Sequence, residues 1–424
     1  MLDIKFIREH PDAVKESLKR RFKQDRCVLV DKLLDLDKEW RSLKQEGDAL
    51  RQKRNLLSEQ VNRLKKQNKD IAVVLKDLKE VPNDIKKLEV RDGELQAEIK
   101  VLLKEIPNLL DDDVPVAQDE EGNKTLRTLG KKPSFKFSLK SHVDILHDLD
   151  LADLERAAKV SGARFYYLKN ELVELDFAII RFALDMLKKQ GYTLMRTPDL
   201  LKKECMEGAA ELGDFAETLY KSDDDLFLIG TAEQTLVSLH AGEVVKDLPL
   251  KYAGISECFR REAGAHGKDT KGIFRVHEFR KVEQLVYCHP DHARKMQETM
   301  IKISEEIFKK LKLHYRVISI ASGALNDTAI KKYDLEVWMP VQNAFREMVS
   351  CSNCTDYQSH ALNIRFQDGE KLVHPYLLNG TAIATPRILV AILENYQQKD
   401  GSIKVPSCLQ KYVSFKVIKP KKNI

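Results

Sequence analysis

The sequence contains no uninterrupted apolar run of the roughly 20 residues that a membrane-spanning helix needs, although 43% of its 424 residues are hydrophobic. The first residues, MLDIKFIREHPDAVKESLKRRF, alternate charged with apolar residues at helical spacing and contain no apolar segment typical of a secretory signal. We therefore predict neither a membrane span nor a secretory signal. A short organellar targeting segment that has been removed stays open.

Cysteine is sparse, and its seven positions are scattered. An odd, scattered set in a chain of this length does not form a disulfide framework, so we expect a reducing compartment, the cytoplasm. Only Cys351 and Cys354 form a CxxC pair, and one pair without a second gives little support for zinc. The net charge of +6 is compatible with a polyanionic partner but does not establish one.

Residues from about 28 to 106 carry heptads. In a first register apolar residues alternate at spacings of four and three from Leu29 to Leu64, broken only by Gly47 and Arg54. A second register runs from Ile71 to Ile106 and is broken only by Asp92. The polar stretch QNKD separates the two registers. This pattern predicts two long helices that pair antiparallel as a coiled-coil arm. Pro82 either kinks the second helix or marks its start.

The outer faces of these two helices are dense in basic residues. These basic residues have two interpretations. Either they form only a solvent-exposed charged surface, as is common on solvated helices, or they bind the phosphates of a nucleic acid. The residues concerned include Lys44, Arg51, Lys53, Arg54, Arg63, Lys65 and Lys66.

The pattern changes after the arm. Residues 106–124 are rich in Pro, Asp and Gly, which is typical of a linker. Helical stretches such as 171–190 then alternate with β-rich ones at 248–260, 274–288 and 334–349. We predict an α+β body around an antiparallel sheet flanked by helices. The expected domains are residues 1–110, a linker at 111–132 and a body at 133–424.

The window 257–284, ECFRREAGAHGKDTKGIFRVHEFRKVEQ, predicts a strand, a polar loop and a return strand. The loop spans Ala263 to Gly272, and Arg260 and Glu262 are expected to project from one side of the sheet. An arginine there can bind a phosphate bidentately, and an aromatic ring can stack on a base. An ordinary hairpin with a charged loop is the alternative. The return strand is expected to include Phe274, Val276, Phe279 and Val282.

This window resembles motif 2 of the class II aminoacyl-tRNA synthetases, in the form typical of seryl-tRNA synthetases. Residues 171–200, including GYTLMRTPDL with Pro198, are similar to motif 1, and LLNGTAIATPRILVAILENYQQ, within 377–398, is similar to motif 3. The arm sequence LLDLDKEWRSLKQEGDALRQKRNLLSE is similar to the helical hairpin of that family. The chain is identified as a member of the seryl-tRNA synthetase family, which implies the class II antiparallel sheet and ATP as a substrate.

The resemblance implies a role for each residue that matches the family's ATP site. Arg260 would contact the α-phosphate and the serine carboxylate, and Arg387 the γ-phosphate; these two are the implied catalytic residues. Glu262 would bind the adenine amino group, Phe279 would stack on the ring, and Arg275 would face the β- or γ-phosphate. Further implied ATP contacts are Arg261, Val276, Met348 and Val349, and the implied Mg²⁺ ligands, which also contact ATP, are Glu347 and Ser350.

The implied serine site uses polar groups, because size alone cannot exclude glycine and alanine. Buried acceptors for the hydroxyl and the ammonium penalise alanine, which leaves them unpaired. The chain carries the TAE triplet, typical of the common zinc-free form, so no zinc is expected. It departs from the family's pattern with threonine at 381, Glu278, and an apparent extra residue in HPYLLNG. The implied serine-binding residues are Thr231, Ala232, Glu233, Arg260, Glu283, Asn379 and Thr381.

The resemblance therefore predicts a serine–tRNA ligase that activates L-serine with ATP and transfers it to tRNA(Ser), with tRNA(Sec) as a further substrate where it exists. Motif 1 implies a homodimer. Two alternatives stay open: a ligase that loads an amino acid onto a carrier protein, and a catalytically silent paralogue that binds RNA. The arm argues against the first, and the retained phosphate-binding and magnesium-binding residues argue against the second.

Overall fold

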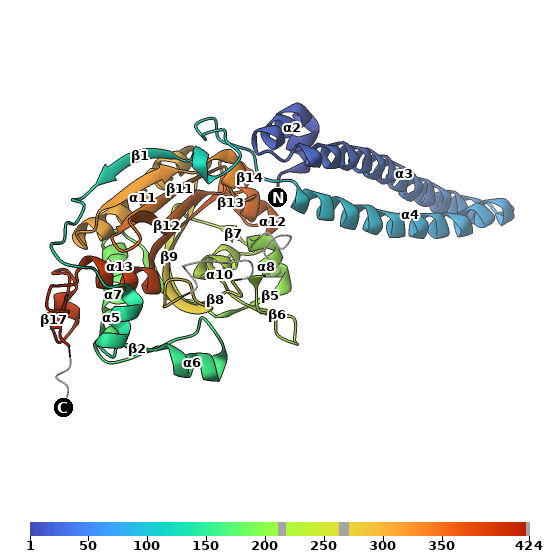
Figure 1. Cartoon of the computed structure of the whole chain (residues 1–424). Coiled ribbons are helices and arrows are strands. Elements are labelled where there is room, and N and C mark those ends of the chain that lie inside the picture. The colour runs from blue at the N-terminus through green and yellow to red at the C-terminus, as the bar shows by residue number, and fades with distance from the viewer. Residues whose placement is uncertain (211–217, 263–270, 421–424) are drawn as a thin grey trace. The chain divides into compact units, whose positions relative to one another are not determined.

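The computed structural model describes residues 1–210, 218–262 and 271–420, and the chain forms two compact units (Figure 1). The first unit comprises Met1–Lys19 and Lys23–Pro107. The second comprises Arg20–Phe22 and Asn108–Ile424.

The first unit is helical. Short helices α1 (Ile4–Glu9), α2 (Pro11–Arg20) and η1 (Gln24–Arg26) precede two long ones, α3 (Cys27–Lys66) and α4 (Ala72–Glu105), which lie side by side (Figure 1). The predicted antiparallel coiled-coil arm is thereby confirmed. Pro82 lies inside α4, ten residues after its first residue, so the interpretation of this proline as the helix start is wrong. The seam buries residues of the predicted heptads, namely Leu33, Val61, Val81, Ile85, Leu95, Ile99 and Leu102.

Asp92, the interruption in the second heptad register, joins the two helices. Trp40 Nε1 donates to Asp92 Oδ1 at 2.8 Å, and Lys44 Nζ lies 3.0 Å from Oδ2. Burial alone would raise the pKa of Asp92, but hydrogen bonds from Lys44, Gln96 and Trp40 outweigh it and the pKa lies below its ordinary value. Asp92, which interrupts the heptad pattern, therefore connects α4 to α3 through polar contacts within a mainly apolar interface.

The second unit is built on an eight-stranded sheet in the order β1-β10-β11-β12-β15-β9-β8-β4. Every pair of neighbours is antiparallel except β4 and β8, which are parallel. This confirms the predicted α+β class with an antiparallel sheet flanked by helices. The strands are β1 (Lys124–Leu129), β4 (Thr193–Arg196), β8 (Leu250–Phe259), β9 (Glu278–Cys288), β10 (Tyr315–Ser319), β11 (Lys331–Met339), β12 (Ala344–Asn353) and β15 (Tyr376–Ala384).

Different helices pack against the two faces of the sheet. Helices α7 (Glu171–Lys189), α11 (Ala293–Lys310) and α13 (Thr385–Asn395) pack with one face around the largest hydrophobic cluster, which includes Val282 and Val286 of β9. The alternate residues Leu285 and Tyr287 point to the other face, because side chains alternate along a strand. There they pack with α10 (Ala232–Ser238).

The remaining elements are short. The helices are α5 (His142–Asp148), α6 (Leu154–Ser161), α8 (Lys203–Ala209), α12 (Tyr357–Ala361), η2 (Glu120–Gly122), η5 (Pro290–His292), η6 (Ser322–Ala324) and η7 (Gln410–Tyr412). The strands are β2 (Ala152–Asp153), β3 (Tyr167–Leu168), β5 (Leu200–Lys202), β6 (Leu226–Leu228), β7 (Val244–Val245), β13 (Arg365–Asp368), β14 (Lys371–Val373), β16 (Ile403–Lys404) and β17 (Val417–Ile418). Among the described helices, none is long and apolar enough to cross a membrane.

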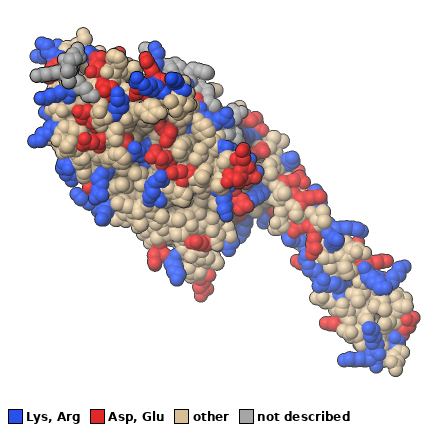
Figure 2. Space-filling model, turned by 90° about the horizontal axis from the view of Figure 1, so that it is seen from below, with Lys and Arg blue, Asp and Glu red and all other residues tan. Residues whose placement is uncertain are grey.

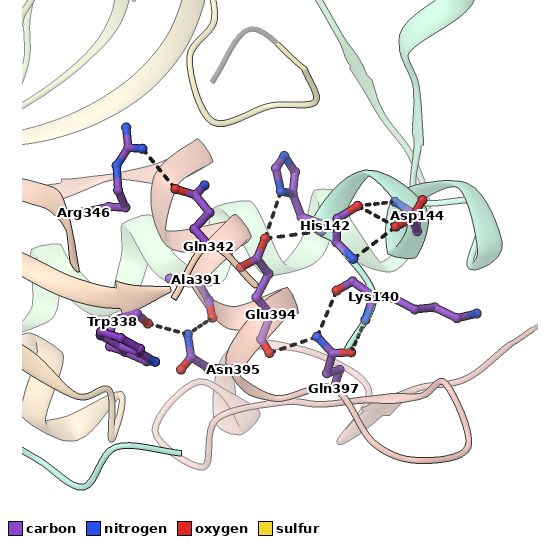
Figure 3. A network of polar contacts seen from close by, with 11 residues as sticks. Lys140, His142, Asp144, Trp338, Gln342, Arg346, Ala391, Glu394, Asn395 and Gln397 are labelled. Carbon is purple, nitrogen blue, oxygen red and sulfur yellow. Dashed lines mark hydrogen bonds and ion pairs between the residues drawn. The ribbon is translucent and has the colours of Figure 1, made fainter. Parts of the chain in front are cut away.

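A buried polar network ties helix α13 to the segment that enters α5 (Figure 3). His142 Nδ1 lies 3.1 Å from Glu394 Oε1, and Gln397 exchanges two hydrogen bonds with the backbone of Lys140. A Cβ atom on Gly272 would lie 2.2 Å from His142 Nε2, and Gly272 has a φ of +76°. Glycine is therefore required where the chain returns from the motif 2 loop.

Two details of the motif 2 prediction are wrong. The return strand begins at Glu278, so Phe274 and Val276 precede it, although both are buried. Strand β8 ends at Phe259, so Arg260 follows the strand, and Glu262 has a φ of +47°. Of the predicted loop Ala263–Gly272, residues 263–270 lie outside the described residues.

Candidate functional site

The predicted site residues gather on the face of the sheet that α10 covers. Phe279, Lys281 and Glu283 alternate along β9 and share that face. Gly254 of β8 lies opposite Glu283. A Cβ atom on Gly254 would lie 3.0 Å from Ala232 Cβ, so the absence of a side chain lets the start of α10 approach the sheet beside Glu283.

Thr231, Lys281 and Glu283 form one hydrogen-bonded group. Thr231 Oγ1 donates to Glu283 Oε2 at 3.1 Å, and Lys281 Nζ donates to Thr231 Oγ1 at 3.4 Å. Lys281 Nζ also pairs with Glu283 Oε2. All three residues are buried, so these contacts satisfy polar groups that water does not reach.

Strand β15 adds two more predicted serine-binding residues. Thr381 lies directly opposite Glu283, and Asn379 lies two residues earlier on the same side of the strand. Both are buried, and Asn379 Nδ2 contacts Cys354 Sγ at 3.5 Å. The structure therefore brings Thr231, Glu283, Asn379 and Thr381 to one place on the sheet.

Glu233 lies in the first turn of α10, within range of the same charges. Burial is the main cause that raises the pKa of Glu233 to about 7, and the carboxylate of Glu283 raises it further. Lys281, a hydrogen bond from Gln358 and the charge of Arg260 act in the opposite direction. Gln358 Nε2 lies 3.5 Å from Glu233 Oε1. This carboxyl group therefore changes charge near neutral pH.

Arg260 connects the start of α10 with β9. Its Nε donates to the carbonyl of Gly230 at 3.2 Å, and its guanidinium carbon lies 5.3 Å from the centre of the Phe279 ring. Its own carbonyl accepts from His277 Nδ1 at 2.8 Å. Arg260 thus stands between the two residue groups predicted to bind serine and adenine.

Other predicted ATP contacts lie around it. Arg275 Nη1 and Glu262 Oε2 are 3.4 Å apart, so these two residues meet. Arg261 is exposed, and its backbone amide donates to the carbonyl of Thr218 at 2.9 Å. The side chains of Val276, Met348 and Val349 are buried in the largest hydrophobic cluster, so only main-chain groups of these residues are available to a nucleotide.

A β-bulge brings the two predicted magnesium ligands to one face. Leu335 pairs with Val349 and Glu336 with Glu347, so β12 contains one extra residue, Met348. Residues three apart on a regular strand point to opposite faces, but one inserted residue reverses this relation. Glu347 and Ser350 consequently share a face.

Arg387, in the first turn of α13, lies against Glu347. Its Nη1 is 3.6 Å from Glu347 Oε2 and donates to the Glu347 carbonyl at 2.9 Å. Burial by surrounding protein would raise the pKa of Glu347, but the charges of Arg387 and, to a smaller extent, Lys332 outweigh it and lower the pKa. The Glu347 side chain is nevertheless 45% exposed, so it is open to a ligand from solvent.

Phe274 supports two arginines. The guanidinium carbons of Arg346 and Arg387 lie 5.0 and 5.4 Å from the centre of its ring. Phe274 was expected in the return strand. It precedes that strand instead, and its ring makes cation–π contacts with arginines at the predicted phosphate site.

Two charged residues near Ser350 were not identified from the sequence. Asp334 lies opposite Ser350 in the sheet, and burial is the main cause that raises its pKa to about 7. Lys332 Nζ lies 3.5 Å from Asp334 Oδ2.

Lys281, in the group around Glu283, was not identified from the sequence either, although its alternation with Phe279 and Glu283 in FRKVEQ indicates that it shares their face of the strand.

The candidate metal ligands beside Ser350 are hard oxygen atoms. Glu347 supplies a carboxylate, Ser350 a hydroxyl, and Asp334 a buried carboxylate whose Oδ1 has no hydrogen-bond partner among the described residues. Such a set fits magnesium, which prefers oxygen ligands.

Cys351 and Cys354 are buried thiols, and burial raises the pKa of Cys351 well above its ordinary range.

The sequence matches two family models. One, described as the seryl-tRNA synthetase N-terminal domain, covers residues 1–110, and the other, the class II tRNA synthetase core domain for G, H, P, S and T, covers residues 217–396. A serine–tRNA ligase of Pyrococcus horikoshii is 45% identical, with 99% of this chain and 98% of that protein covered. One from Nitrosopumilus maritimus is 43% identical, over 97% and 99%.

The chain belongs to the seryl-tRNA synthetase family.

Solved structures of the family agree in fold. The seryl-tRNA synthetase of P. horikoshii in complex with ATP superposes with a TM-score of 0.94 at 44% identity over the full length of both chains. The cytoplasmic serine–tRNA ligase of Naegleria fowleri in complex with AMP gives 0.88 at 35% identity, covering 100% of this chain and 99% of that one.

A separate cavity of about 590 Å³ lies elsewhere in the second unit. Lysines, histidines and apolar side chains line it, among them Lys246, Lys295, His289 and Phe366. None of its lining residues belongs to the predicted site.

Proposed function

We propose that the chain activates L-serine with ATP and transfers the seryl group to the 3′ end of tRNA(Ser). It is a ligase of the aminoacyl-tRNA synthetase class. The observation that carries the serine assignment is the group formed by Thr231, Lys281 and Glu283 with Thr381 directly opposite. These groups offer a buried carboxylate and hydroxyls to a small substrate that carries both a hydroxyl and an ammonium group.

The activation step requires charge stabilisation and alignment. The serine carboxylate attacks the α-phosphorus of ATP, a bond forms between them, and pyrophosphate leaves. Arg260, at the junction of the serine and adenine groups, would neutralise the charge at the α-phosphate and the carboxylate. Arg387 and Arg275 would bind the outer phosphates. The 3′-hydroxyl of the tRNA then attacks the seryl carbonyl, and AMP leaves.

Glu347 and Ser350 would hold the magnesium ion that accompanies ATP. A bound magnesium ion neutralises charge on the phosphate oxygens and fixes their geometry. The bulge at Met348 supports this assignment because it places both side chains on one face. The pKa of Glu347 is held low beside Arg387, so its carboxylate is charged and ready to bind a cation at neutral pH.

The coiled-coil arm is proposed as the tRNA-binding element. On the face of the arm that Figure 2 shows, basic and acidic side chains are intermixed, and basic ones gather toward the α3–α4 turn. Residues 60–80 contain six Lys or Arg and three Asp or Glu, which makes this end of the arm positively charged. A basic surface with few aromatics suits contacts with the RNA backbone. Residues 1–110 would form this domain and 133–424 the catalytic body; residues 111–132 would join them, with Lys124–Leu129 paired to the sheet of the body as β1.

A homodimer in the cytoplasm is the proposed state of the enzyme. Strand β4 is the last strand of the sheet, so one of its edges is available for pairing with a second copy. Large apolar side chains are exposed on and near the motif 1 segment, namely Phe177, Leu194 and Leu200. The seven cysteines are free thiols, as suits a reducing compartment.

ATP–pyrophosphate exchange tests the activation step. Serine, threonine, alanine and cysteine are supplied separately to the wild type, Arg260→Ala and Glu283→Ala. Exchange with serine alone, and its loss in both variants, is the expected result. A folded protein that exchanges with none of the four would contradict the proposal and favour a silent RNA-binding paralogue.

A further inference from the structure

Lys281 is a buried lysine in the middle of the proposed serine site. Its exposed fraction is 8%, and lysine is rarely buried unless it is paired. The residue lies on β9 between Phe279 and Glu283 on the same face of the sheet, opposite Ser256 of β8 and Ala384 of β15.

The ammonium group of Lys281 contacts two proposed serine ligands at once. It pairs with Glu283 Oε2 and donates to Thr231 Oγ1 at 3.4 Å, while Thr231 Oγ1 donates to the same Glu283 oxygen. Both contacts with Glu283 use Oε2, and neither uses Oε1. The lysine thus fixes one carboxylate oxygen and directs the other away from this group.

Several charged and titratable groups face this pocket. They are Glu233 on α10, Arg260 after β8 and Cys258 on β8, together with Glu283 and Lys281 on β9. Two carboxyl groups are therefore close together, and the charge of Glu283 raises the pKa of Glu233. Lys281 lowers the pKa of Glu233, as does Arg260.

We propose that Lys281 is a positioning residue for serine: it holds Glu283 and Thr231 in the geometry in which Glu283 Oε1 accepts a hydrogen bond from the substrate. The inference rests on the proposed function, because it assigns a role within the serine site. It predicts that Lys281 acts on serine binding and on discrimination against alanine, and that it does not act on ATP binding.

The alternative is that Lys281 only compensates the buried charge of Glu283. A purely structural lysine would affect folding, and its loss would alter the kinetic constants for serine and ATP alike. The two roles are separated by measuring each substrate's KM independently.

The experiment compares Lys281→Met and Lys281→Arg with the wild type in ATP–pyrophosphate exchange. Methionine keeps the length of the side chain without the charge, and arginine keeps the charge with a different geometry. Lys331→Met is the matched control, because Lys331 is also a little-exposed strand lysine with an acidic partner, Asp113, at 3.2 Å. Serine, alanine and ATP are varied in turn.

For Lys281→Met we expect the KM for serine to rise about tenfold or more and the preference for serine over alanine to fall by a similar factor. The KM for ATP should stay within about twofold of the wild type. For Lys281→Arg, the KM for serine and the preference for serine over alanine should lie between those of Lys281→Met and those of the wild type. Lys331→Met should match the wild type in both. The acid limb of kcat/KM for serine should move to higher pH in Lys281→Met, because Lys281 lowers the pKa of Glu233.

Thermal unfolding with and without ATP reports whether each variant is folded and binds nucleotide. If Lys281→Met does not fold, Lys281→Arg decides: a rise in the KM for serine alone supports the proposal. Equal changes for serine and ATP, or no change for either, overturn it while wild-type exchange with serine keeps the proposed function intact. Failure of the wild type to exchange would instead remove the proposed function, and this inference with it.

Discussion

Thr231 Oγ1 donates a hydrogen bond to Glu283 Oε2 at 3.1 Å, although 52 positions separate the two residues in the sequence. The start of α10 and the middle of β9 meet there because Gly254 and Ala232 leave room for the helix on the sheet. Thr381 faces the same carboxylate from the neighbouring strand. The pocket therefore offers hydroxyl and carboxylate groups to the proposed substrate, serine.

Thr381→Val should weaken serine binding because it removes the hydroxyl and keeps the shape. We expect the KM for serine in pyrophosphate exchange to rise about tenfold to a hundredfold, with the KM for ATP unchanged. Thr381→Ser is the control, since it keeps the hydroxyl, and it should retain nearly full activity. Equal kinetics for the valine and serine variants would show that the Thr381 hydroxyl does not contact the substrate.

Activity toward serine should depend on the charge of Glu233. Its pKa is raised to about 7, mainly by burial and also by Glu283, so the carboxyl is neutral below that pH and charged above it. A neutral group holds an ammonium less well, so kcat/KM for serine should fall by about tenfold per pH unit below this pKa. Glu233→Gln should lack this acid limb, whereas the KM for ATP should show no matching pH dependence in the wild type. A limb that persists in Glu233→Gln would assign it to another group.

Arg387→Ala should impair ATP use. The guanidinium lies 3.6 Å from the Glu347 carboxylate, helps to keep its pKa low and is proposed to bind the γ-phosphate. We expect kcat/KM for ATP to fall about a hundredfold or more and the magnesium concentration for half-maximal activity to rise. Arg387→Lys, which keeps the charge but loses the planar fork, should lie between the alanine variant and the wild type. If the magnesium dependence of Arg387→Ala equals that of the wild type, Arg387 does not influence magnesium binding at Glu347.

The basic end of the arm should act in tRNA charging only. Combined replacement of Arg63, Lys65, Lys66 and Lys69 by alanine should raise the KM for tRNA by about tenfold or more and should make it less sensitive to salt, since fewer counterions are released. Pyrophosphate exchange without tRNA is the internal control and should not change. A loss of exchange in this variant would mean that the arm contributes to activation itself.

Local periodicity was sufficient to predict the arm and part of the sheet, namely β8, β9 and the β-rich stretch 334–349, which the structure divides into β11 and β12. Heptads identify α3 and α4 because a coiled-coil seam repeats its pattern over many turns. Strand β1, in contrast, was not predicted, because the side chains of its sequence KTLRTL are almost all exposed and it has no alternating buried face. Phe274 and Val276 were assigned to a strand because alternating apolar residues look alike in a strand and in a buried loop.

The positions of the site residues depended on features that the sequence pattern does not contain. The bulge at Met348 unites Glu347 and Ser350, and their spacing alone would have put them on opposite faces. Their assignment came from the family resemblance. Asp334 and Lys332 were missed because only the pairing of β11 with β12 brings them to Ser350. Asp92 looked like a defect in a heptad because its partners, Trp40 and Lys44, lie about 50 residues away.

Charging of tRNA with radiolabelled amino acids tests directly whether this protein is a serine–tRNA ligase. The purified protein is incubated with ATP, magnesium and a tRNA(Ser) transcript, with serine, alanine or threonine as the labelled substrate and an alanine-specific tRNA as control. We expect acid-precipitable label with serine and tRNA(Ser) only, and none for Arg260→Ala. Label with another amino acid, or no label from a folded protein that binds ATP, would contradict this assignment.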